Sequence, residues 1–141
     1  MTFAGIPDQY ATKDSKIYLQ SIPYDGTSTW GKGADRGFEA FMEAASNMEL
    51  YDIETKSSVY ENGIFLLDTA PDFSSAQEVF NYCYQNTKEL IRKEKFLSFF
   101  GGEHSISIGI IKAFYEHFPG ISILQLDAHA DLRPVYEGTP Y

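Results

Sequence analysis

The sequence predicts an α/β fold, a three-layer α/β/α arrangement in which helices cover both faces of a parallel sheet. Two observations lead to this prediction. Short apolar runs of strand length alternate with longer segments whose apolar residues recur at helical spacing. Connections of this length also suit right-handed crossovers between parallel strands. With 43% hydrophobic residues, the 141-residue chain can bury a sizeable core, which excludes disorder as its main state.

The first half of the chain supplies two predicted strands and one helix. Residues 16–22 form an apolar run that a proline and an Asp-Gly turn close. A polar, glycine-rich loop follows over 26–37. Apolar residues at helical spacing then predict a helix over 38–47, and residues 63–68 predict a second strand.

The second half begins with the clearest predicted helix, which runs from Ser75 to about Lys95. Ser75 and Glu78 have the spacing of a capping box, and an apolar face that includes Cys83 follows. A strand is predicted over 96–100 and a helix over 106–118, with a Pro-Gly pair as its stop signal.

The last predicted strand, 121–126, ends in three polar side chains at every second position: Asp127, His129 and Asp131. Because side chains of a strand alternate between its faces, we expect these three to point to one side. Parallel sheets place their sites just beyond the carboxyl ends of strands. The spacing therefore predicts a row of metal ligands.

A second strand end repeats this layout, since the run 96–100 is followed by a glycine turn and then His104. A lone Asp-x-His is more often structural, but two of the three histidines lie in these strand ends, which favours one shared metal site. Imidazole with carboxylate and no sulfur suits manganese, iron(II), cobalt or zinc. The number of aspartates favours a hard ion, and a bridging carboxylate would fit a pair.

Three motifs resemble the ureohydrolase (arginase/agmatinase) family: Gly101-Gly102-Glu103-His104-Ser105, Asp127-Ala128-His129-Ala130-Asp131-Leu132-Arg133 and Tyr136-Glu137-Gly138. A shortened N-terminal signature is similar at Pro23-Tyr24-Asp25, Gly33-Ala34 and Gly37-Phe38. The resemblance implies an arginase-like fold and two manganese ions, whose bridging hydroxide attacks a guanidinium carbon and releases urea. By motif match, His104 and Asp131 would bind one ion, His129 the other, and Asp127 both.

The surroundings of the second and third motifs look more like agmatinases, which implies agmatine as substrate and putrescine as product. Family members are about twice as long, and their second half carries an Asp-x-Asp motif and an acidic residue for the guanidinium. We therefore expect residues 1–141 to be the N-terminal part of a single, truncated ureohydrolase domain, with its acid and base residues beyond Tyr141. The alternatives are a non-catalytic fragment with residual metal binding, or a ureohydrolase for arginine or guanidinobutyrate.

The net charge of −9 argues against nucleic acid and anionic membranes as partners and favours a cationic small molecule, although solubility alone also explains it. A single cysteine, Cys83, excludes intrachain disulfides and predicts a reducing compartment. Because no apolar leader or membrane-spanning run is present, a cytoplasmic location is predicted, and the full-length enzyme is expected to be a homo-oligomer.

Four other residues are expected to have structural or supporting roles. His117 should lie at a helix C-terminus, where the backbone dipole favours a cation, and Cys83 should belong to the core. Glu103 either supports a neighbouring ligand or serves as an acidic residue at a helix N-terminus. We expect Arg133 to pair either with a site carboxylate or with a partner subunit.

Overall fold

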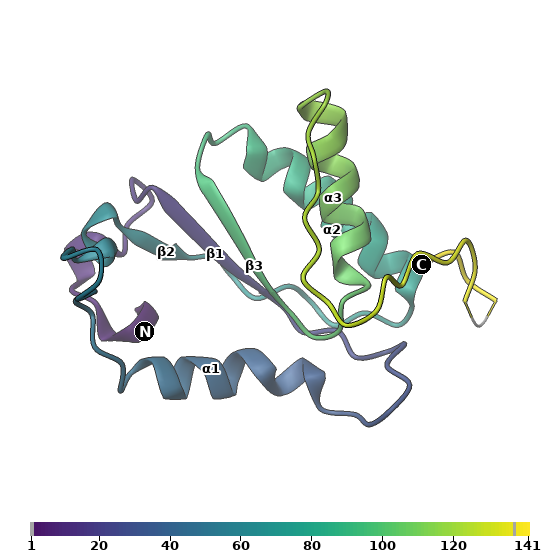
Figure 1. Cartoon of the computed structure of the whole chain (residues 1–141), viewed down its shortest axis with the longest axis horizontal. Coiled ribbons are helices and arrows are strands. Elements are labelled where there is room, and N and C mark those ends of the chain that lie inside the picture. Colours follow the sequence, from purple (N-terminus) through teal and green to yellow (C-terminus); the bar gives the residue numbers. More distant parts are fainter. Residues whose placement is uncertain (1, 137) are drawn as a thin grey trace.

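The computed structural model describes residues 2–136 and 138–141, and its elements follow the predicted alternation (Figure 1). Met1 and Glu137, the latter part of the third family motif, lie outside the described residues. The strands and helices are β1 (Ile17–Ile22), α1 (Gly37–Ala45), β2 (Ile64–Leu66), α2 (Ala76–Ile91), β3 (Phe96–Gly101) and α3 (Ile106–His117). The predicted helix C-terminus at His117 is therefore confirmed.

The three strands form one parallel sheet in the order β2-β1-β3. β1 lies in the middle, with Ile17 in register with Ile64 of β2 and Phe96 of β3. Its residues from Tyr18 to Ile22 are all buried, as expected for a strand with helices on both faces. The predicted parallel α/β fold is confirmed.

Two apolar clusters lie on opposite faces of this sheet. On one face Leu19 packs with Ile64, and Phe100 contacts the rings of Phe38 and Phe41 from α1. On the other face a second buried cluster joins β1 to α2 and α3, and its members are Ile22, Tyr24, Ala70, Val79, Cys83 and Ile106. Figure 1 shows α1 on one side of the strands and α2 with α3 on the other, which gives three layers.

The capping box that the sequence predicts is present at the start of α2. The Ser75 hydroxyl oxygen accepts a hydrogen bond from the Glu78 backbone N–H at 3.3 Å. In return the Glu78 carboxylate accepts the N–H of Ser74 at 2.9 Å, one residue earlier than in the standard arrangement. This second bond holds the pKa of Glu78 below its ordinary value.

The predicted strand over 121–126 is wrong. The segment has no regular structure, and none of the described residues pairs with it as a β-ladder. Its Leu124 and Leu126 side chains are 83% and 88% exposed. An apolar run becomes a strand only where a neighbouring strand takes its backbone hydrogen bonds, and such a partner cannot be seen in the local pattern.

Among the described residues, no helix combines the length and the apolar run that a bilayer crossing requires.

Cys83 is fully buried in the core, as the sequence predicts, and this burial raises the pKa of its thiol from an ordinary value of 9.0 to about 12. Between pH 9 and 12 the unfolded thiol loses its proton while the folded one keeps it. The free energy of unfolding should therefore fall as pH rises through this window. Urea unfolding at pH 8 to 11 measures this, and the decline should be shallower in Cys83→Ala.

The same burial should protect the native thiol from a disulfide-exchange reagent at pH 8, with labelling only after urea is added. Rapid labelling of the folded chain would contradict the burial of Cys83.

Candidate metal centre

The site begins at a turn that directly follows β3 and is hydrogen-bonded to the end of β1. The Gly102 N–H donates to the Ile22 carbonyl at 3.1 Å, and the Glu103 N–H donates to the Tyr24 carbonyl at 2.7 Å. A Cβ atom on Gly102 would lie 1.8 Å from that Tyr24 oxygen, so only glycine permits this approach. The turn therefore presents His104 at the carboxyl ends of two parallel strands.

Three of the four predicted ligands converge here. The Nδ1 atom of His104 lies 3.7 Å from an oxygen of Asp127 and 3.7 Å from an oxygen of Asp131. Taken together, one ligand atom from each residue lies within 4.8 Å of the others. One imidazole and two carboxylates can hold an ion such as Mn(II), because this donor set contains hard oxygen atoms and no sulfur.

The fourth predicted ligand, His129, is not part of this group. Its Nδ1 atom lies 4.0 Å from an oxygen of Asp127, and its side chain is largely exposed. The expectation that alternate side chains would point to one side of a strand is wrong, because the chain bends here. The His129 N–H donates to the Asp127 carboxylate at 2.9 Å, and Asp131 adopts a left-handed φ of 50°.

This bend also favours the ionised form of Asp127. The hydrogen bond from the His129 backbone lowers the pKa of the Asp127 carboxyl, and the nearby imidazole of His104 lowers it further. An ionised carboxylate is the form that binds a metal ion.

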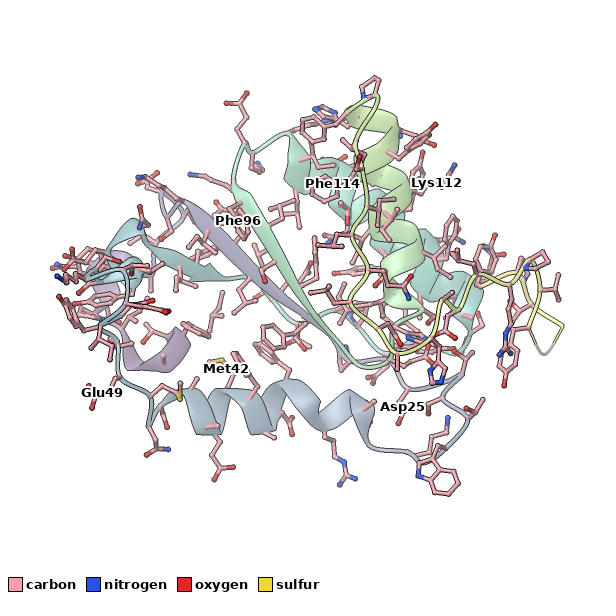
Figure 2. All side chains as sticks on the ribbon, viewed as in Figure 1. Asp25, Met42, Glu49, Phe96, Lys112 and Phe114 are labelled. Atoms are coloured by element: carbon pink, nitrogen blue, oxygen red, sulfur yellow. The ribbon has the colours of Figure 1, made fainter. Side chains whose placement is uncertain are left out.

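The glycine-rich loop after β1 is closed by Asp25, whose side chain is only 7% exposed. Its carboxylate accepts the backbone N–H groups of Gly33 at 2.5 Å and Ala34 at 3.1 Å, and the Ser28 hydroxyl also donates to it. These bonds, with Ser28 foremost, hold the pKa of Asp25 below its ordinary value. Figure 2 shows Asp25 beside the point where β1 and β3 end, at the opposite end of the sheet from Phe96.

An open cavity of about 810 Å³ adjoins the site. Residues 27–31 of the glycine-rich loop form one wall, Ile108 and Ile111 of α3 form part of another, and the His104, Asp127 and Asp131 side chains line it as well. The cavity is large enough for an elongated small molecule. Arg133 also lines it, and its guanidinium lies 4.8 Å from the centre of the Tyr136 ring.

The sequence pattern did not reveal two contacts at this site: the hydrogen bonds that Asp25 accepts, and a hydrogen bond of 2.6 Å from the Thr27 hydroxyl to the Glu103 carboxylate. Asp25 was visible only as a member of the weak N-terminal signature. The Thr27 hydroxyl and the Glu103 carboxylate are 76 residues apart along the chain, whereas the contacts of Asp25 lie within its own loop, whose irregular conformation has no sequence periodicity.

A model of the arginase family matches residues 15–141. The chain belongs to the arginase family. Among curated members, an N(1)-aminopropylagmatine ureohydrolase of Thermus thermophilus is 29% identical over 92% of this chain and 44% of its own length. An agmatinase of Bacillus cereus is 30% identical over 91% of the chain and 44% of its own length. The chain thus spans less than half the length of these arginase-family relatives.

The arginase fold is also found by comparison with solved structures. The agmatine ureohydrolase of Thermoplasma volcanium superposes with a TM-score of 0.82 at 24% identity, over 90% of this chain and 42% of that one. A structure described as a putative agmatinase from Clostridium difficile gives a TM-score of 0.78, also at 24% identity, over 91% and 47%. At this identity the likeness establishes the fold alone, and it confirms the fold that the family resemblance implied.

Proposed function

We propose that this chain forms the N-terminal part of a manganese-dependent amidinohydrolase that converts agmatine into putrescine and urea. The observation that carries the proposal is the convergence of His104, Asp127 and Asp131 at the wall of a cavity, at the carboxyl ends of parallel strands. Relatives named agmatinase and N(1)-aminopropylagmatine ureohydrolase support the reaction class.

In this proposal His104 and Asp131 would hold one manganese ion, His129 would hold a second, and Asp127 would contribute its carboxylate to both. Bound manganese supplies a Lewis acid that lowers the pKa of a coordinated water toward neutrality. Four side chains are too few for two such ions. The remaining ligands and the acid and base residues would therefore come from outside these 141 residues.

The residues of the chain also have roles in binding the proposed substrate. The Asp127 and Asp131 carboxylates give the cavity a negative potential, and the net charge of −9 attracts cations such as agmatine. Ile108 and Ile111 offer an apolar wall for an aliphatic chain. The cytoplasmic location and the homo-oligomeric state stay predictions.

Metal binding is the direct test of this site. We expect the chain alone to bind Mn(II) weakly, because affinity depends on the number of ligands. His104→Ala and Asp127→Ala should each lower the Mn(II) affinity by about 100-fold or more. This loss exceeds the one expected when a residue that only hydrogen-bonds to a metal ligand is removed. Isothermal titration calorimetry with Mn(II) measures this.

The matched control for this titration is His117→Ala, which removes the histidine at the end of α3, and it should bind like the unaltered chain. Two tight sites in the isolated chain would show that further ligands are unnecessary. Absence of any Mn(II) binding would contradict the proposed metal site.

Arg133 in the cavity wall favours a second candidate, a ureohydrolase for a guanidino acid such as arginine or guanidinobutyrate, because a guanidinium can hold a carboxylate in two hydrogen bonds. The two candidates make different predictions for a chimera in which this chain is joined to the rest of the Bacillus cereus agmatinase. We expect a higher kcat/KM on agmatine than on arginine, since agmatine has no carboxylate to place.

In the same chimera Arg133→Ala should leave kcat/KM on agmatine nearly unchanged. A higher kcat/KM on arginine, lost in Arg133→Ala, would overturn the agmatinase assignment and establish the second candidate.

A further inference from the structure

We propose that Thr27 and Glu103 are positioning residues that couple the glycine-rich loop to the metal ligand His104. The coupling deepens the proposed function, since its consequence for metal binding rests on that function. The link itself is a feature of the folded chain and can be tested without metal.

The contacts converge on one carboxylate. The Thr27 hydroxyl lies 2.6 Å from each of the two Glu103 carboxylate oxygens, and the Ser105 hydroxyl donates to the same carboxylate. All three residues are half-buried, and hydrogen bonds to an ionised acceptor are stronger than neutral ones. Glu103 and Ser105 flank His104, so the carboxylate restrains the backbone on both sides of the ligand.

The loop is restrained at its other end as well. At that end the Asp25 carboxylate accepts the backbone N–H groups of Gly33 and Ala34. The same carboxylate also accepts the hydroxyl of Ser28, one residue after Thr27. The segment 27–31 begins at the Thr27 attachment and runs toward Gly33. It lines the cavity together with His104, Asp127 and Asp131. A molecule in the cavity that displaces this segment therefore also displaces the Glu103 carboxylate, through its hydrogen bond with Thr27.

Of the two roles that the sequence left open for Glu103, these contacts favour support of a ligand. An acidic residue at the start of α3 would act through the helix dipole and would not require Thr27. Instead the structure gives its carboxylate two hydroxyl donors, one of them 76 residues away along the chain. Coupling between loop and ligand must also be reciprocal, so that metal binding restrains the loop.

The only tryptophan of the chain reports on this loop. Trp30 lies in the segment 27–31, and its side chain is 95% exposed. Its fluorescence anisotropy therefore follows the mobility of the loop with no background from other tryptophans.

The first experiment uses the metal-free chain and compares Thr27→Val, which removes the hydroxyl at nearly constant shape, with Thr27→Ser, which keeps it. In Thr27→Val we expect amide hydrogen exchange to rise about tenfold in both 26–33 and 102–106, the effect of losing one charge-assisted hydrogen bond. Trp30 anisotropy should fall in parallel. Thr27→Ser should behave like the unaltered chain. Faster exchange in the loop alone, or in neither segment, would overturn the link.

The second experiment adds Mn(II), with affinity from calorimetry and loop mobility from Trp30 anisotropy. In the unaltered chain and in Thr27→Ser we expect anisotropy to rise as Mn(II) binds. In Thr27→Val, Mn(II) affinity should fall about tenfold and the anisotropy should no longer respond. Equal affinity and response in both variants would overturn the coupling, as would binding without any response in the unaltered chain. If the unaltered chain binds no Mn(II), the proposed function fails, and the hydrogen-exchange result still decides whether the link exists.

Discussion

Gly102→Ala is expected to destabilise the fold by about 3 kcal/mol or more, as overpacking against fixed atoms does. The added Cβ would meet the carbonyl oxygen of Tyr24 at 1.8 Å. No side-chain rotation relieves this contact, because the position of a Cβ atom is fixed by its own backbone and the Tyr24 carbonyl is itself a backbone group. The strand ends must separate, which breaks the bonds from Gly102 to Ile22 and from Glu103 to Tyr24. His104 then loses its position beside Asp127 and Asp131.

Urea unfolding followed by circular dichroism measures this change, and Mn(II) titration should show loss of binding in the same variant. Gly37→Ala is the matched control. Gly37 begins α1 with a helical φ of −60°, and its added Cβ would meet no atom within 4 Å. That substitution should be neutral or stabilise by roughly 0.4–1 kcal/mol. Equal stability of the two variants would refute the close approach at Gly102.

The chain is expected to self-associate in spite of its charge of −9. Seven large apolar side chains in the segment after α3 are exposed, and four of them form what we term the apolar strip: Ile123, Leu124, Leu126 and Leu132. All four also line the cavity with Ile108 and Ile111, so the exposed apolar surface is continuous with α3. Surfaces of this kind mark interaction sites or aggregation.

Light scattering over a concentration series tests this expectation. Leu124→Glu and Leu126→Glu should each raise the concentration of half-association about tenfold. Each variant loses the free energy that burial of one leucine side chain contributes to association. Ile53→Glu provides the control, because Ile53 is similarly exposed but lies outside the apolar strip. A monodisperse monomer with a sharp cooperative melt would show that the apolar strip needs no cover.

Much of the fold follows from local features of the sequence. The strand at 17–22 and the helix that starts after Ser75 depend on apolar spacing and a capping box, which act within a few residues. The family motifs likewise identified three residues that do converge, His104, Asp127 and Asp131.

Other features were decided only by tertiary structure. Whether 121–126 becomes a strand depends on a neighbouring strand, and among the described residues none pairs with it. Without that ladder, the Asp127 carboxylate accepts the nearest backbone N–H, and the resulting bend leaves His129 outside the group formed by His104, Asp127 and Asp131. The Thr27–Glu103 link joins two chain segments through one hydroxyl and one carboxylate. Local propensity cannot specify such contacts, because their free energy exists only once the sheet has brought the two segments together.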